Sequence, residues 1–344
     1  MTAGTTSPSA GPPRFSQKEM AGRAAALDEV MRGAEVEHVV VYGANRSGSG
    51  VQWLTGWPVT REAVVVHSIG EQDSLLVHFF NHVPQARRVA TEASVQWAGH
   101  TPSSVVEELR ARGAGAGSRV GVIGALPFQA FRVLESAVGG VVDLNGAYTR
   151  LRLRKSAEEI EWLKRAAELT DLSCTALQQR AAPGSSEHEL VALVEGSYLP
   201  LGGTSYIHYF SIASMDSPDQ CVPAQWPGER RLSTGDVLSC ELSTSFGIDY
   251  PGQLLRTFTV GAEPTPLYKE LHAVADEALN RIEALLAPGV TPLEVVEAAA
   301  VIEEAGFTTV DDLVHGLGGG YLPPVFAHGV GPWSRCPISG SPKA

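Results

Sequence analysis

Short β-branched runs alternate with helical segments up to Val142, and this alternation constrains the fold more than any other feature of the chain. The runs end at glycine or polar residues and read HVVVYG, EAVVVHS, DSLLVHFF and SRVGVIG. Such runs predict strands. Helical segments lie between them, notably at residues 103–112 and 128–138. The alternation predicts a mixed α/β layer with helices packed on a sheet.

A polar amino-terminal segment precedes this layer. Residues 1–15 consist mainly of Ser, Thr, Pro and Gly and contain almost no apolar side chains. Such a composition cannot offset the entropy cost of ordering the chain, so a disordered tail is expected. From Ser16 onward apolar residues recur at helical spacing, and Ser16 is suited to cap the first helix.

A second strong helix signal marks the start of a second domain near Leu151. Ser156 and Glu159 have the spacing of a capping box. This helix is expected to end before the breaker Ala182-Pro183-Gly184. A chain of 344 residues exceeds the ~100–200 typical of one domain. We therefore expect a tail at residues 1–15, an α/β domain at 16–150 and an α+β domain at 151–344.

The second domain should contain further helices and a strand pair. The sequence predicts a helix at residues 186–198, a turn-rich stretch to Arg231, strands in LSTGDVLSCELSTSF and LLRTFTVG, and helices at 265–286 and 291–305.

The charge balance excludes several classes of partner. With 26 basic and 38 acidic residues the formal charge is −12, which repels phosphate backbones and anionic membrane surfaces. Apolar runs stop far short of the ~18 residues needed to cross a bilayer. The amino terminus lacks a basic-then-apolar leader pattern. We expect a cytoplasmic protein that binds neither nucleic acid nor membranes.

The cysteines do not predict a metal or disulfide framework. The chain has four, with no CxxC pair: Cys174, Cys221, Cys240 and Cys336. Free cysteine behaves mostly as a small hydrophobic residue, so buried, unreactive thiols are expected.

Three local patterns suggest chemistry but favour ordinary structural roles. GANRSGSG at residues 43–50 has Ser49 where a phosphate loop needs Lys, so a tight turn is favoured. His78 and His82 are four apart in an expected strand, a separation of ~13 Å that is too long for one metal. No GxSxG elbow is present, which argues against a serine hydrolase.

Several segments of the second half occur in the order found in one known family. They are RLRLRKSAEEIEWLKRAAEL, SIASMDSPDQCVPAQWPGERRLSTGDVL, CELSTSF, QLLRTFTVG and VHGLGGG. In this order they resemble the creatinase, prolidase and aminopeptidase P family of pita-bread hydrolases. VQWLTGWP also resembles the YLTG strand of that family's amino-terminal domain. The resemblance implies a creatinase-type α/β domain followed by a pita-bread domain.

In the family, two Asp, one His and two Glu hold a pair of divalent metals that deliver hydroxide to an amide carbon. Glu241 stands at the position of the first Asp and keeps a carboxylate. Gln253 stands at the position of the second Asp, and a neutral amide coordinates metal poorly. The spacing of these two residues is one longer than the family pattern, which allows a β-bulge. Asp249 is nearby, but a turn residue of this kind is usually a solvated cap.

The remaining family positions are only partly retained. His315 opens an HGxG segment and matches the His ligand, although a His beside glycines can also be a core residue. Ala224 replaces the family's second functional His. No Asp or Glu follows Asp312, so the two Glu ligands are missing, and we expect a carboxyl-terminal end that is shortened or replaced. The resemblance implies a divalent metal pair, but the ligands are not retained, so we expect no bound metal and no other cofactor.

Three functions remain open from the sequence. The first is a metal-independent hydrolase that cleaves a C–N bond of a small polar amide or amidine, with Glu241 and His315 as an acid–base pair. Substrate would be oriented by the side chains of His208, Tyr209, Gln253 and Arg256. The second is an inactive relative that serves as a binding module. The third is a metal-dependent Xaa-Pro peptidase acting on dipeptide-like substrates, and the family resemblance implies a homodimer in each case.

Overall fold

The computed structural model describes residues 13–45 and 49–326. The chain forms two compact units, Met1–Ile160 and Glu161–Ala344, which are described separately. The division falls inside helix α7 (Ala157–Arg180), ahead of which the expected capping box is formed. The Glu159 N–H donates to Ser156 Oγ at 3.1 Å, and the Ser156 N–H donates to Glu159 Oε2 at 2.8 Å. None of the helices in the described part of the chain could span a bilayer.

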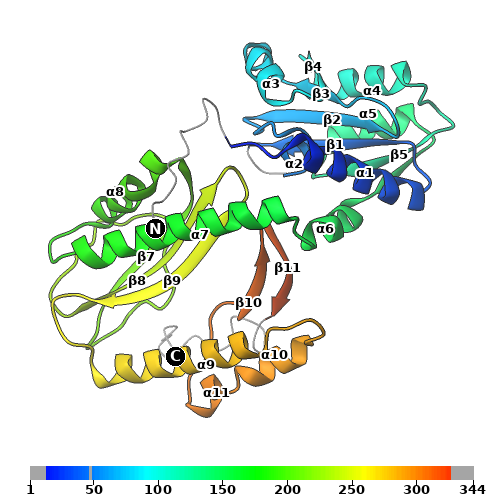
Figure 1. Cartoon of the computed structure of the whole chain (residues 1–344). Helices are drawn as coiled ribbons and strands as arrows, with labels where there is room; N and C mark the ends of the chain where they lie inside the picture. Colours follow the sequence, from blue (N-terminus) through cyan, green and yellow to red (C-terminus); the bar gives the residue numbers. More distant parts are fainter. Residues whose placement is uncertain (1–12, 46–48, 327–344) are drawn as a thin grey trace, which may run out of the picture. The chain divides into compact units, whose positions relative to one another are not determined.

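The first unit is built on a six-stranded sheet in the order β4-β3-β2-β1-β5-β6 (Figure 1). Neighbours β1–β2 and β2–β3 are antiparallel, whereas β3–β4, β1–β5 and β5–β6 are parallel. The mixed α/β layer predicted from the sequence is confirmed. The strands are β1 (His38–Ala44), β2 (Glu62–Ser68), β3 (Ser74–Val77), β4 (Ser94–Trp97), β5 (Arg119–Ile123) and β6 (Gly140–Asp143).

The unbroken apolar run of β1 is explained by burial on both faces of this sheet. Val39 and Val41 pack into one core together with α1, and Val40 packs into a second core together with α4. Ser16 caps α1 as expected, since its hydroxyl accepts from the Glu19 N–H at 3.1 Å. The helices are α1 (Gln17–Gly33), α2 (Ser49–Thr55), α3 (Val83–Val89), α4 (Thr101–Ala111), α5 (Phe128–Ala137) and α6 (Asn145–Leu153).

The strand expected to continue through HFF is shorter than predicted. It ends at Val77, and a short 3₁₀ helix η1 (Phe80–His82) follows, because the proline at the start of α3 favours helical geometry there. His78 Nδ1 lies 3.8 Å from Glu62 Oε1, and His82 Nδ1 lies 2.9 Å from Thr60 Oγ1. The turn predicted at 43–50 includes residues 46–48, which lie outside the described residues.

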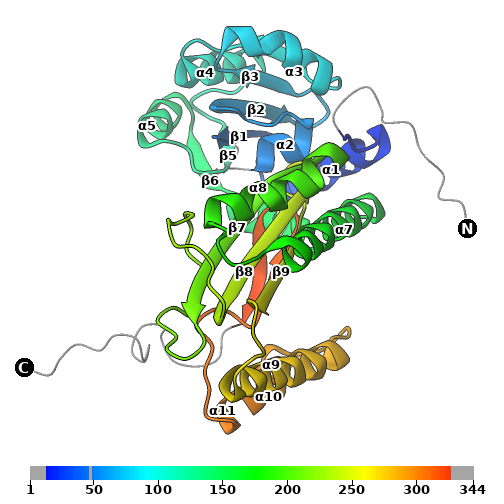
Figure 2. The same cartoon turned by 90° about the vertical axis from the view of Figure 1, so that its left-hand side faces the viewer.

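The second unit begins with a three-stranded antiparallel sheet in the order β7-β8-β9. Its strands are β7 (Gly203–Ser214), β8 (Asp236–Phe246) and β9 (Pro251–Thr259). Helices α7 and α8 (Glu187–Tyr198) cover one face, as Figures 1 and 2 show, and the short 3₁₀ helix η2 (Leu199–Leu201) follows α8. Leu169 and Leu190 of the helices share a core with Leu238 and Leu242 of β8.

The remainder of this unit is a helical layer followed by a hairpin. Helices α9 (Pro266–Leu285), α10 (Pro292–Ala298) and α11 (Val301–Glu304) precede strands β10 (Val314–Leu317) and β11 (Tyr321–Phe326). Ile282, Val295 and Ala299 form a separate small core, against which Val314 packs. The core therefore places β10 directly against the helical layer.

Two expectations for this unit are wrong. Strand β7 occupies residues that were expected to be turn-rich, because the alternating aromatic and β-branched residues of TSYIHYFSIA outweigh the small residues around them. The helix expected at 291–305 is interrupted near Ala300, whose N–H bonds to the Glu297 carbonyl at 3.1 Å. That i−3 partner marks a tightening of the backbone that divides the segment into α10 and α11.

The first unit contains an ion-pair cluster that predicts a pH-dependent stability. His67 is buried, and its Nδ1 lies 2.6 Å from Asp73 Oδ1 while its Nε2 lies 2.8 Å from Asp28 Oδ1. Burial opposes a charge on the imidazole, but the hydrogen bonds and charges of Asp73 and Asp28 outweigh it and raise the pKa of His67.

A raised pKa means that the stabilisation is complete below the unfolded-state pKa and is lost as pH rises through the folded-state value. His67→Asn should therefore lower the free energy of unfolding by about 2 kcal/mol near pH 5.5, with a smaller loss near pH 8.5. Urea unfolding of both proteins at the two pH values measures this. An equal loss at both would contradict a charged His67.

Candidate functional site

Strand β8 has two chemically different faces. Leu238, Cys240 and Leu242 belong to the core beneath α7 and α8. Because side chains alternate along a strand, Glu241, Ser243 and the other odd-numbered residues project to the opposite face. Ser239 Oγ and Thr257 Oγ1 lie 3.2 Å apart on that face. The sheet therefore presents a polar surface on the side away from α7 and α8.

Glu241 is the half-buried acid at the centre of this polar surface. It accepts a hydrogen bond at 2.6 Å from Nε2 of Gln253 on the neighbouring strand. The pairing of β8 with β9 is regular, with Ser243 opposite Gln253 and Glu241 opposite Leu255. The spacing between Glu241 and Gln253 is one residue longer than in the family, but the regular register shows that no β-bulge causes it. Register alone places the amide diagonally beside the carboxylate.

His315 reaches this part of the unit on the β10–β11 hairpin. Its ring stacks on Tyr321 with centroids 4.5 Å apart and planes at 28°. The hairpin turn contains Gly318, Gly319 and Gly320, all with positive φ, and the Gly319 N–H donates to the Asp249 carbonyl at 2.6 Å. Asp249 lies in the turn between β8 and β9, so the three glycines let the hairpin approach the sheet.

The electrostatics connect Glu241 with this hairpin. Burial raises the pKa of Glu241, the Gln253 hydrogen bond opposes that rise, and the charge of Asp311 adds to it. His315 lowers the same pKa, and Asp312 raises it. Burial followed by Asp312 likewise raises the pKa of Asp311. Glu241, the Asp311-Asp312 pair and His315 therefore act on one another within one site.

The substrate-orienting residues proposed from the sequence divide between the two faces of the sheet. Tyr209 of β7 lies opposite Glu241 in the register and shares its face. His208 lies opposite Leu242 on the helix-covered face, where its Nε2 is 2.7 Å from the hydroxyl of Tyr198. The structure therefore brings Tyr209 and Gln253 to Glu241 but not His208.

Arg256 is also on the helix-covered face. It lies opposite the core residue Cys240, and its Nη1 donates to the Leu255 carbonyl at 2.8 Å. Arg256 and Gln253 are three residues apart on one strand, and side chains an odd number of residues apart project to opposite faces. Arg256 is therefore not part of the group around Glu241.

Ala224 stands where the family has its second functional His, and its backbone contacts are clear in the structure. The N–H of Ala224 donates to the carbonyl of Phe210 at 2.8 Å, so the segment that carries it pairs with the edge of β7. A methyl side chain at this point has no proton to transfer.

A sequence model of metallopeptidase family M24 matches residues 161–338. The chain belongs to metallopeptidase family M24. The predicted relationship to the pita-bread hydrolases is thereby confirmed.

The sequence matches to two named relatives each cover about half of the relative's length. A Xaa-Pro aminopeptidase of Escherichia coli is 26% identical over 205 residues, which are 58% of this chain and 45% of the relative. A Xaa-Pro dipeptidase of Pyrococcus furiosus is 28% identical over 171 residues, which are 49% of this chain and 47% of the relative. The chain thus spans about half the length of these relatives.

Solved M24-type structures share the fold over most of the chain. A prolidase from Pyrococcus furiosus superposes with a TM-score of 0.73 at 20% identity and covers 87% of this chain and 86% of its own. The dipeptidase PepE from Mycobacterium ulcerans gives 0.74 at 20% identity and covers 93% of this chain and 87% of its own. These likenesses confirm the predicted creatinase-type and pita-bread architecture.

The donor set does not fit the metal pair that the M24 name implies. The amide nitrogen of Gln253 faces the Glu241 carboxylate as a hydrogen-bond donor, and a neutral amide supplies little charge for a divalent ion. Within residues 13–45 and 49–326, no group of three or more His, Cys, Asp or Glu side chains is arranged to hold a metal ion.

Two features of the M24 site were not anticipated from the sequence. The hydroxyls of Ser243 and Ser245 are buried on the Glu241 face without hydrogen-bond partners. Asp311 and Asp312 precede His315 and act on Glu241 through their charges. The alternation of serines in ELSTSF and the DD pair beside the HG motif are the sequence signals that could have identified them.

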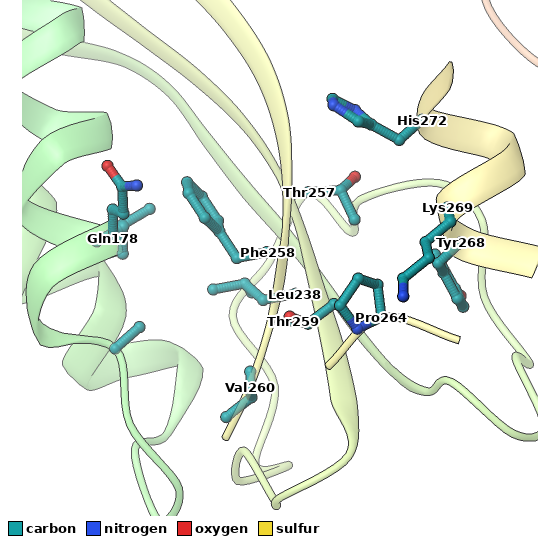
Figure 3. A pocket seen from close by; sticks show the side chains of 12 residues that line it. Gln178, Leu238, Thr257, Phe258, Thr259, Val260, Pro264, Tyr268, Lys269 and His272 are labelled. Carbon is teal, nitrogen blue, oxygen red and sulfur yellow. The ribbon is translucent and has the colours of Figure 1, made fainter. Parts of the chain in front are cut away.

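A separate cleft of about 480 Å³ lies at the free edge of β9. Figure 3 shows Gln178 of α7 and His272 of α9 on opposite sides of this strand, with Lys269 also on the α9 side. Neither Glu241 nor His315 lines the cleft. Thus this cleft and the Glu241 site are different places in the second unit.

The cysteines match the expectation only in part. Cys240 is buried, and burial raises the pKa of its thiol to about 12. Cys174 is partly buried and its pKa is also raised by burial. Cys221 is exposed, because it lies in the irregular segment after β7 and not in a core. The expectation for Cys336 concerns a position outside the described residues.

The Gln253–Glu241 contact predicts the direction of a measurable pKa change. Gln253→Leu removes the donor to the carboxylate and should raise the pKa of Glu241 further, because burial is then less opposed. Carbon-detected NMR titration of the Glu241 carboxyl would measure it. Gln178→Leu, in the separate cleft, is the matched control and should leave the value unchanged. A fall in the Gln253→Leu variant would contradict the contact.

Proposed function

We propose that this M24 protein hydrolyses a C–N bond of a small polar amide or amidine without a metal pair. The observation that supports the proposal most is Glu241, a half-buried acid whose pKa is raised by burial and which lies in electrostatic range of His315. An acid with a raised pKa is better matched to proton transfer near neutral pH than an exposed one.

In the proposed reaction the two side chains divide the proton transfers. Glu241 takes a proton from a water molecule as the water oxygen bonds to the substrate carbon. The His315 side chain then gives a proton to the nitrogen as the C–N bond breaks. General acid–base catalysis of this kind contributes ~10²–10⁴-fold to a rate.

Gln253 and Tyr209 are the orienting residues in this proposal. Gln253 holds Glu241 through its amide nitrogen, and Tyr209 lies beside Glu241 in the register. We leave His208 and Arg256 out of the orienting set because both project to the face covered by α7 and α8.

Two alternatives rest on specific observations. A binding module without catalysis is favoured by the neutral Gln253 and by Ala224, which replace two side chains expected to act in the family's chemistry. A metal-dependent Xaa-Pro peptidase is favoured by family membership and by relatives that are named as Xaa-Pro peptidases. A cytoplasmic location and a homodimer also stay predictions from the sequence.

A substrate panel with a matched pair of variants tests the proposal. The panel contains small amides, amidines, lactams and an Xaa-Pro dipeptide, and turnover is followed by release of the amine. Glu241→Gln should lower kcat by ~10²–10⁴-fold while the fold is kept. Glu283→Gln on the exposed part of α9 is the control and should retain full activity.

Unchanged turnover in Glu241→Gln would contradict the assignment of this residue. Absence of turnover across the panel, together with saturable binding of one compound, would favour the binding module instead.

A further inference from the structure

Strand β9 forms an open edge of the three-stranded sheet. The strand order is β7-β8-β9, and within the described residues no strand pairs with the outer side of β9. At the opposite edge, by contrast, the Ala224 N–H donates to the Phe210 carbonyl of β7 at 2.8 Å. An open edge presents backbone donors and acceptors in a row, so β9 can accept a further strand.

The backbone groups on this outer side belong to the odd-numbered residues of β9. The Val260 N–H, directly after the strand, donates to the Asp236 carbonyl at 2.9 Å, so the even-numbered positions bond toward β8. In an antiparallel pair, residues that bond to the neighbouring strand alternate with residues that face away from it. Leu255, Thr257 and Thr259 therefore direct their N–H and C=O groups outward.

Arg256 closes one end of this open edge. Its Nη1 donates to the outward-facing carbonyl of Leu255 at 2.8 Å. Thr257 is exposed and Thr259 is partly buried. An added strand therefore has the backbone of Thr257 and Thr259 as its hydrogen-bond partners.

The cleft of about 480 Å³ lies along the same edge, and its α7 side is apolar. Leu177, Ala181 and Phe258 line it there, and all three belong to or pack against the core beneath α7 and α8. Figure 3 shows the Phe258 ring on the same side of β9 as Gln178. This wall therefore favours an apolar side chain of a ligand.

The α9 side of the cleft is polar and basic. Lys269 and His272 line it together with Thr257, and Tyr268 packs against the cluster that contains Val237 of β8. Since Val237 is odd-numbered, α9 lies on the face to which Thr257 also projects. Among the described residues, those that line the cleft include no Asp or Glu, although the whole chain carries a charge of −12. The α9 wall therefore favours an acidic side chain.

We propose that the outer edge of β9 binds an extended segment of a partner protein, added as an antiparallel fourth strand with alternating apolar and acidic side chains. Both existing pairings of the sheet are antiparallel, so such a strand continues their pattern. Residues opposite each other in a pair share a face, so the ligand residues opposite Thr257 and Thr259 direct their side chains toward Lys269 and His272. The ligand residue between them directs its side chain to the apolar wall. This site is apart from Glu241 and does not depend on the proposed function.

The register also determines which ligand N–H groups bond to β9. The ligand residues opposite Thr257 and Thr259 exchange backbone hydrogen bonds with them, and these are the residues with acidic side chains. The N–H groups of the apolar ligand residues point away from the sheet. Methylation of the ligand backbone nitrogen should therefore weaken binding at acidic positions and be tolerated at apolar positions.

Blocked pentapeptides of sequence Val-Glu-Val-Glu-Val test this inference. NMR titration of the intact 344-residue chain, followed at the amide signals of Thr257 and Thr259, gives the affinities. Methylation of both Glu nitrogens should weaken binding at least about tenfold, because two hydrogen bonds are lost. Methylation of the second and third Val nitrogens is the matched control and should change the affinity less than about twofold. Replacement of both Glu by Lys should weaken binding at least about fivefold.

Two protein variants test the two walls separately. Lys269→Glu should reduce the preference for the Glu peptide over the Lys peptide below about twofold, whereas Lys18→Glu, the same charge change at an exposed position of the first unit, should leave it unchanged. Thr257→Pro removes an outward N–H and no bond to β8, so the protein should fold while the effect of methylating the Glu nitrogens becomes smaller.

Three results would overturn the inference. The first is an equal loss of affinity on methylation at the Glu and the Val nitrogens. The second is an absence of shifts at Thr257 and Thr259 with millimolar peptide, or a preference for the Lys peptide. The third is a change of the same signals with protein concentration alone, which would mean that a second copy of the chain occupies this edge.

Discussion

Alternation along β8 is the constraint on which the site depends. Leu238, Cys240 and Leu242 must pack beneath α7 and α8, which forces Glu241 and Ser243 to the opposite face. The regular register with β9 then brings Gln253 beside Glu241. A slip of one residue would place the carboxylate in the apolar core and remove the site. The packing of the apolar face of β8 and the placement of Glu241 on the other face therefore depend on each other.

Much of this could be predicted from sequence, and the errors have physical causes. The strands carrying Glu241 and Gln253, the HGxG segment and the two-part architecture followed from motif order and apolar periodicity, whereas the β10–β11 hairpin was not predicted. His208 and Tyr209 are adjacent in one strand and therefore point to opposite faces, as do Gln253 and Arg256, so only one of each pair could join the site. The order of motifs does not show to which face of a strand each side chain projects. For this reason all four residues were expected at one site.

Other features depend on contacts that a sequence pattern does not display. Strand β7 contains small residues that favoured a turn prediction, and its pairing with β8 adds to the strand preference of its aromatic and β-branched residues. The role of Asp311 and Asp312 depends on where the hairpin lies, which is determined by the bonds from the glycine turn to Asp249. In the first unit, too, a contact could not be read from a local pattern, since Asp28 and Asp73, which bind His67, lie far apart in the sequence.

We propose that in this M24 fold an acid–base pair, Glu241 and His315, takes the place of metal-ion chemistry. Elemental analysis of purified protein, combined with turnover before and after exhaustive chelation, tests it most directly. We expect well below one equivalent of Mn, Zn, Fe or Co per chain and a kcat that chelation leaves unchanged. Two equivalents of metal, with activity that is lost on chelation and restored by adding the metal, would contradict it.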